Sequence, residues 1–192
     1  MAEEVKFGLS LELPSPGKIR TAMAELDARA RADDTFDPVR FTDEDNFDTT
    51  VMTGSRILEE AGARFVMSGF GNPRWPLELS YDGSMIIEDL PDFMAGLVDL
   101  DGGTATLHMD GQGVETDLVF QTAGEDLRIT CNPRNSWLNP DLVHHVPEIA
   151  VLEMFDRLAR NFALSLEMMD AEVAARPPFP RWRTFIWPDE SG

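Results

Sequence analysis

The sequence predicts an α+β fold in which an antiparallel sheet of about six to seven strands packs against a long C-terminal helix and N-terminal helices. Three observations lead to this prediction: apolar residues that alternate with polar ones, apolar residues at helical spacing, and tight-turn residues between short β-rich segments. Strands in groups, with the helices set apart, are typical of the α+β class. Tight turns favour antiparallel pairing, because parallel strands need long crossover connections.

The N-terminal part contains one predicted strand and two predicted helices. Apolar and polar residues alternate strictly over residues 5–13, which indicates a strand with one buried face. Ser15-Pro16 then provides an N-cap and a proline at the first helical position, so we expect a helix to about Arg31. A second helix is expected over about 50–61, with Gly62 following its end.

A β-hairpin is predicted in the middle of the chain. A strand over 65–70 is followed by two β-rich segments, 77–81 and 85–88, with Asp82-Gly83 between them. Asp-Gly favours the tight turn of a hairpin because both of its central residues need positive φ. A short helix over 90–98 is expected to follow.

The second half predicts three strands and the longest helix. The strands cover 104–109, 114–122 and 127–131 and are separated by glycine-containing turns. Residues 132–147 read as an ordered loop. A wide apolar stripe predicts a helix from about 147 to 175 that lies across a sheet or another helix.

We expect residues 1–175 to form a single α+β domain and residues 176–192 to form a C-terminal tail rich in proline, aromatic residues and arginine. The prolines of this tail argue against both a helix and a central strand. Basic and aromatic residues alternate over 181–185, which is typical of single-strand nucleic-acid binders, but three arginines do not offset the charge of the whole chain. We therefore expect the tail to fold back over the acidic sheet or to dock onto a second copy.

The composition limits the partners and the compartment. With 35 acidic and 16 basic residues, the chain carries a formal charge of −19, which argues against nucleic acid and anionic membranes as ligands. One cysteine excludes an intramolecular disulfide. No apolar run approaches the ~18 residues of a membrane helix, and Met1-Ala2-Glu3-Glu4 lacks the basic region of a signal peptide. These features predict a cytoplasmic monomer or homodimer.

Acidic residues are concentrated in one part of the sequence. From Trp75 to Leu127 the chain has no Lys or Arg over 53 residues but contains twelve Asp and Glu residues. One interpretation is a solubilising surface. The other is a surface for a basic protein partner, because complementary charge accelerates association and disfavours wrong partners.

The candidate partner-binding residues are carboxylates of this segment and two tryptophans. The carboxylates would pair with Arg and Lys of the partner, and exposed tryptophans are frequent anchors of interfaces. Four further aromatic residues of the tail, at 179, 182, 185 and 187, would serve equally if exposed. The primary set comprises Asp99, Asp101, Asp110, Glu115, Asp117, Trp75 and Trp137.

A second hypothesis places a small-ligand or catalytic pocket between the sheet and the long helix. Cys131 precedes His144-His145 by 13 residues, so a Cys–His pair is conceivable, although a single strand cysteine is typically a small buried apolar residue. No zinc or calcium loop pattern is complete, and we expect no metal or cofactor. The pocket would be drawn from Cys131, Asn132, Arg134, Asn135, Trp137, His144 and His145.

From Gly62 onward, the order of three strands, a short helix (90–98), further strands and a C-terminal helix resembles small acidic bacterial binding proteins. These are immunity proteins, which neutralise co-encoded toxins, and secretion-chaperone-like domains. The resemblance covers about 115 residues and concerns layout and charge. It implies a non-enzymatic protein that masks a basic partner, preferably an immunity protein that neutralises a toxin by occlusion. A secretion-effector chaperone and the ligand pocket remain as alternatives.

Overall fold

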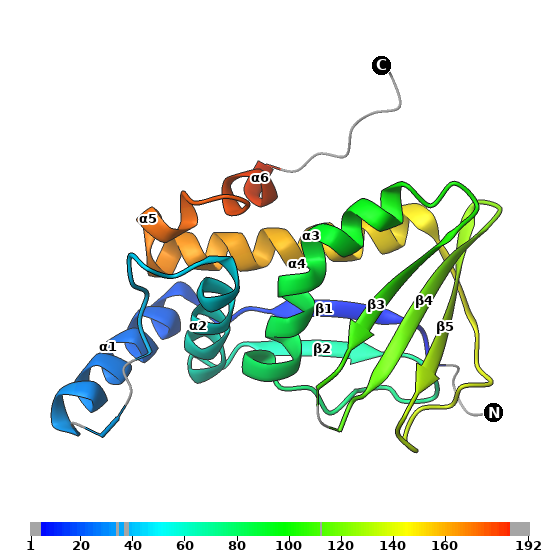
Figure 1. Cartoon of the computed structure of the whole chain (residues 1–192). Helices are drawn as coiled ribbons and strands as arrows, with labels where there is room; N and C mark the ends of the chain where they lie inside the picture. The colour runs from blue at the N-terminus through cyan, green and yellow to red at the C-terminus, as the bar shows by residue number, and fades with distance from the viewer. Residues whose placement is uncertain (1–4, 34, 37–38, 112, 185–192) are drawn as a thin grey trace.

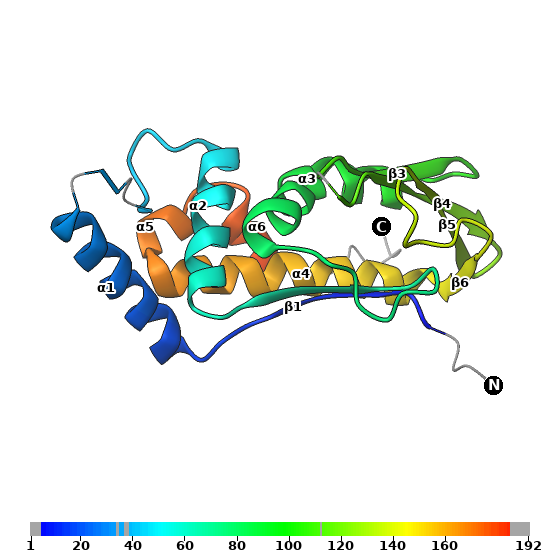
Figure 2. The same ribbon diagram turned by 90° about the horizontal axis from the view of Figure 1, so that it is seen from below.

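The long helix α4 (Glu148–Met169) runs along an elongated molecule and connects its two ends (Figures 1 and 2). A sheet lies at one end, and helices α1 (Pro16–Ala32), α2 (Phe47–Glu60) and α5 (Ala171–Ala174) lie at the other. The computed structural model describes residues 5–33, 35–36, 39–111 and 113–184. The mixture of helices and sheets confirms the α+β class.

The strands of the described residues form two antiparallel sheets, so the prediction of one sheet with six to seven strands was wrong. Two strands form a ribbon, in which β1 (Gly8–Glu12) pairs with β2 (Arg64–Ser68). The second sheet has four strands in chain order: β3 (Thr104–Met109), β4 (Thr116–Ala123), β5 (Asp126–Pro133) and β6 (His144–Pro147).

Local signals determine the N-terminal elements as predicted. Leu9 and Leu11 are buried while their neighbours are more exposed, as the alternation in the sequence requires. Helix α1 begins with Pro16 at its first position. The Asn46 side chain caps α2 by accepting a hydrogen bond from the Thr49 N–H at 2.9 Å. Gly62, with φ +88°, follows the end of α2, where an L side chain would be strained.

The predicted hairpin over 77–88 does not exist. Residues Leu79–Gly83 form η1, a short π-helix that continues directly into helix α3 (Ser84–Val98). Gly83 has φ −67° and ψ −37°, a right-handed helical conformation rather than the positive φ that the turn needs. The predicted helix over 90–98 is thus the second half of α3.

Two interactions explain this helical start. The Glu59 carboxylate of α2 accepts hydrogen bonds from the N–H groups of Leu79 (2.8 Å) and Ser80 (3.3 Å) and thereby caps η1 from a neighbouring helix. The Asp82 carboxylate accepts the Glu78 N–H at 2.8 Å. The apolar residues are buried at helical spacing, as shown by Leu79, Ile86 and Leu90.

The segment 132–147, expected as a loop, ends in strand β6. Ile129 of β5 pairs with His144 of β6. The buried His144 ring accepts a hydrogen bond from the Phe70 N–H at its Nε2 atom, at 2.9 Å, which fixes the strand against the β2–η1 connection. This distant contact explains why a polar His-His sequence forms a strand.

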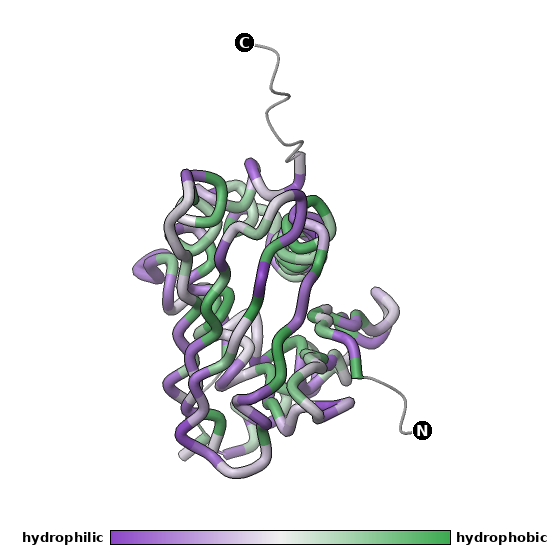
Figure 3. The backbone as a smooth tube through the Cα atoms, turned by 90° about the vertical axis from the view of Figure 1, so that its right-hand side faces the viewer, coloured by the Kyte–Doolittle hydropathy of each residue, from purple (hydrophilic) through white to green (hydrophobic). Residues whose placement is uncertain are grey.

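The core joins both sheets to α3 and α4 around Phe120. Its ring lies edge-on to Phe7 of the β1 side, Phe93 of α3 and Phe155 of α4, with centroids 5.2–6.1 Å apart. Figure 3 views the sheet end and shows hydrophilic and hydrophobic colours alternating along the strands. Phe120 is therefore the point at which the separate layers meet.

The C-terminal segment packs on the helical part of the molecule. Helix α4 ends at Met169. The tail contains helix α6 (Phe179–Thr184), although its prolines argued against a helix. Phe179 and Trp182 are buried and contact the Phe47 ring at the start of α2. Residues 176–184 thus lie against α4 and α2, so for this described part of the tail the expectation that it covers the sheet was wrong. Phe185 and Trp187 lie outside the described residues.

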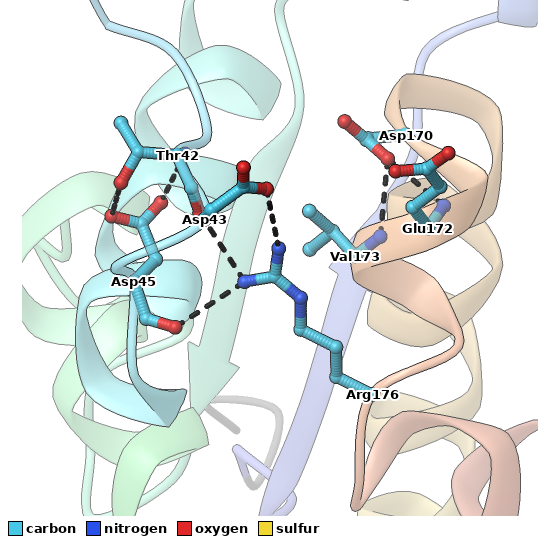
Figure 4. Close-up of polar contacts among 7 residues, drawn as sticks. All are labelled: Thr42, Asp43, Asp45, Asp170, Glu172, Val173 and Arg176. Atoms are coloured by element: carbon cyan, nitrogen blue, oxygen red, sulfur yellow. Dashed lines mark hydrogen bonds and ion pairs between the residues drawn. The ribbon is translucent and has the colours of Figure 1, made fainter.

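Arg176 fixes the tail to the loop that precedes α2 (Figure 4). Its Nη1 donates to the carbonyl oxygens of Thr42 and Asp45, both at 3.3 Å, and its Nη2 lies 3.8 Å from the Asp43 carboxylate. The Asp170 side chain caps α5. The carboxylates of this region therefore have structural roles.

Candidate functional site

The antiparallel topology gathers three acidic segments at one end of the four-stranded sheet. The α3–β3 turn lies beside the β4–β5 turn, because Thr104 pairs with Gln121. The β4–β5 turn lies in turn beside the start of α4, where the Glu148 N–H donates to the Glu125 carbonyl at 3.1 Å. Figure 1 shows this meeting point at the upper right. We call its carboxylates the acidic end: Asp99, Asp101, Glu125, Asp126 and Glu148.

The local sequence exposes three of these carboxylates, whereas Asp126 and Glu148 are half-buried. Gly124 has φ +76° and closes the short β4–β5 turn, so that Glu125 projects from it as an exposed residue. Asp99 and Asp101, on the α3–β3 turn, are also exposed. Glu148 occupies the first turn of α4, where the helix dipole favours a negative charge.

The negative charge of the acidic end is not offset by ion pairs with the described residues. Among residues 5–33, 35–36, 39–111 and 113–184, none of its five carboxylates has a Lys, Arg or His partner within 4.0 Å. Like charges in one place repel each other and cost folding stability. A basic partner would relieve this repulsion.

The predicted carboxylates are divided between the two ends of β3. Asp99 and Asp101 belong to the acidic end, whereas Asp110 and Glu115 lie in the β3–β4 turn and Asp117 at the start of β4. Six residues of strand separate the two groups by about 20 Å. Asp110 pairs with Arg134 at 2.8 Å and Asp117 with His108 at 2.9 Å.

The two predicted tryptophans form a structural pair near the second group. Trp75 is 2% exposed and belongs to the core. Trp137 is half-buried, packs edge-to-face on Trp75 with centroids 5.3 Å apart, and donates its indole N–H to the Gly113 carbonyl at 3.0 Å. Trp137 thus holds the 134–143 loop against the β3–β4 turn, and Trp75 packs behind it.

The residues of the second hypothesis support this loop. Cys131 is buried, and burial raises the pKa of its thiol to about 11, so the thiol is protonated at neutral pH. Its Sγ lies 3.8 Å from the Asn139 carbonyl.

The other residues of this hypothesis are either bound to the backbone or exposed. The Nε2 atom of His144 accepts a hydrogen bond from the Phe70 N–H, whereas His145 is exposed. Asn135 donates to the Val114 carbonyl. Asn132 and Arg134 are exposed.

Sequence reasoning missed an apolar groove of about 300 Å³ between α3, α4 and the α6 region. Pro91, Met94 and Val98 line it from α3, Phe155 and Asp156 from α4, and Trp182 from α6. Asp99 and Arg181 also border it. The groove could not be recognised from the sequence because its α3 wall is more than 50 residues from its α4 wall in the chain.

Asp156 is the unusual polar residue of the groove. Its side chain is 11% exposed, and burial raises the pKa of its carboxyl group. Oδ2 accepts a hydrogen bond from Arg160 at 2.6 Å. Oδ1 is buried without a hydrogen-bond partner among the described residues.

Glu88 of α3 makes folding stability depend on pH. Burial, together with Asp48 and Asp89, raises the pKa of its carboxyl group from 4.5 to about 7. Between about pH 4.5 and 7 the folded state holds a proton that the unfolded state has lost, so the free energy of unfolding falls as the pH rises. Glu88→Gln should raise this free energy at pH 8 by about 1–2 kcal/mol, allowing for solvent screening, and much less at pH 5.

Urea unfolding at pH 5 and pH 8 measures this difference. The exposed Glu44→Gln variant serves as the control and should retain the wild-type pH dependence. Parallel pH profiles for wild type and Glu88→Gln would contradict the role of Glu88.

No group of three or more His, Cys, Asp or Glu residues among those described is arranged to hold a metal ion. In the same part of the chain, none of the helices has the length and apolar character needed to cross a bilayer. No protein-family model, curated protein or solved structure matches the chain. The proposals below therefore rest on geometry and charge.

Proposed function

We propose that the chain is a non-enzymatic binding protein whose acidic end masks a basic protein partner. The observation that carries this proposal is the convergence of five carboxylates, from three separate segments, without a cationic partner among the described residues. Arg and Lys side chains of a partner would neutralise the repulsion and gain charge-assisted hydrogen bonds.

An immunity protein is the form we favour. A nuclease-like toxin holds phosphate with Arg and Lys, and an acidic surface placed over those residues would block the nucleic acid by occlusion. The alternative of a secretion-effector chaperone would use the same contacts, and the identity of the partner would separate the two. An enzyme that uses Cys131 is less well supported, because a thiol with a pKa near 11 is a poor nucleophile at neutral pH.

The proposal is tested with two variants of equal charge. The first neutralises the acidic end: Asp99→Asn, Asp101→Asn, Glu125→Gln and Asp126→Asn. The second neutralises exposed acidic residues elsewhere: Glu25→Gln, Glu44→Gln, Asp141→Asn and Glu172→Gln. Both variants lose four negative charges, so a difference between them reports position rather than net charge.

In a pull-down from the native host at low salt, the wild type and the control should retain one stoichiometric basic protein. The acidic-end variant should retain at least about tenfold less, because steering by complementary charge contributes about 10–10³ to association rates. At ~0.5 M salt, where the Debye length is about 4 Å, retention by the wild type should also fall. Equal retention by both variants, or no partner at either salt, would contradict the proposal.

A further inference from the structure

The apolar groove opens onto the acidic end. Val98 and Asp99 are consecutive residues at the end of α3: Val98 lines the groove and is 50% exposed, while Asp99 borders the groove and belongs to the acidic end. A partner bound at the acidic end would therefore lie next to an apolar surface that is open among the described residues. The volume of the groove, about 300 Å³, is within the range of ligand pockets.

Carboxylates give part of the groove a negative charge. Asp99 lines it at the end of α3, and Asp156 lines it in the first half of α4. The Asp156 side chain is 11% exposed and adds a second carboxylate beside Asp99 to the groove lining. A ligand with an apolar face and basic groups towards Asp99 complements this arrangement.

We propose that the groove between α3, α4 and α6 binds an amphipathic helical segment of the basic partner, with the apolar face of that segment in the groove and its basic residues over the acidic end. This inference rests on the proposed function and names the element of the partner that is recognised. A helix fits because its i, i+3, i+4 and i+7 side chains form one apolar stripe with charged residues beside it. The two walls provided by α3 and α4 receive such a stripe.

Three labelled 18-residue peptides provide the probe. The first carries Leu on one helical face and Lys on the other; the second has the same composition in shuffled order, without an apolar face; the third has Glu in place of Lys. Fluorescence anisotropy with the full chain measures their affinities. The first peptide should bind at least about tenfold more tightly than the second, and the third should not bind.

Ala95→Trp fills the groove from an exposed position of α3. Met52→Trp adds the same side chain at an exposed position of α2 and serves as the matched control. Ala95→Trp should weaken binding of the first peptide at least about tenfold, and Met52→Trp should leave it unchanged. Val98→Ser, at a half-exposed position, should weaken it several-fold and keeps the test valid if Ala95→Trp does not fold. Circular dichroism checks folding.

The outcomes separate the two proposals. If the shuffled peptide binds as tightly as the amphipathic one, or if neither groove variant weakens binding, the groove does not bind the helix, while recognition of basic partners by charge stands. If neither lysine peptide binds at low salt, both proposals fail. Binding of the Glu peptide with the affinity of the Lys peptide would overturn the proposed orientation and the role of the acidic end.

Discussion

Phe120→Ala is expected to lower the free energy of unfolding by about 3–5 kcal/mol, the typical cost of removing a buried phenylalanine. Phe120 is fully buried, and its ring contacts Phe7, Phe93 and Phe155, which belong to three different layers. The surrounding rings are held by separate elements, so they cannot all move inward to fill the cavity. Urea unfolding followed by circular dichroism and by tryptophan fluorescence measures the loss.

Gln121→Ala provides the control for this prediction. Gln121 is the next residue of β4 and is exposed, so its replacement should change the free energy of unfolding by no more than about 0.5 kcal/mol. The two probes should give coincident transitions in both variants. A loss below about 1 kcal/mol for Phe120→Ala would show that Phe120 does not join the layers.

Trp182→Ala is expected to cost about 3–5 kcal/mol and to loosen the groove. The Trp182 side chain is 8% exposed and packs edge-to-face on Phe179 and Phe47, with centroids 5.5 and 5.9 Å apart. Because Phe47 begins α2, loss of the indole removes contacts between the tail and the N-terminal half. Chemical denaturation measures the change in stability.

Thr184→Ala is the matched control in the same helix. Thr184 is exposed, and its hydroxyl group donates to the carbonyl oxygens of Pro180 and Arg181 in the same helix at 3.3 and 3.4 Å, so the substitution should cost no more than about 0.5 kcal/mol. If Trp182→Ala were as stable as Thr184→Ala, residues 176–184 would be an appendage that contributes nothing to folding.

The elements with strong local signals were predicted from the sequence. The alternation in β1, the proline at the start of α1, the glycine after α2, the turns between β3, β4 and β5, and the stripe of α4 all concern neighbouring residues. The errors arose where contacts between residues far apart in the sequence determine the secondary structure. Glu59 caps η1 from α2, and His144 accepts a hydrogen bond from Phe70, so a predicted hairpin became a helix and a predicted loop became a strand.

Only some residues of the acidic end were predicted from the sequence. Asp99 and Asp101 were chosen because they lie in the segment without Lys or Arg, but the choice of Asp110, Glu115 and Asp117 ignored the direction of β3. An antiparallel meander places alternate turns at the same end, so Glu125 and Asp126 could have been grouped with Asp99. Glu148 could not have been assigned to this group from the sequence, because strand β6, which leads into α4, was not predicted.

Hydrogen–deuterium exchange of the chain with the partner captured from the host locates the interface directly. We predict that the partner protects the amides of 97–103, 122–127 and 148–156, which form the acidic end and the adjoining groove, and leaves the exchange of 110–116 and 134–139 unchanged. Protection confined to the β3–β4 turn and the 134–143 loop, or no protection in either region, would contradict recognition of a basic partner by the acidic end.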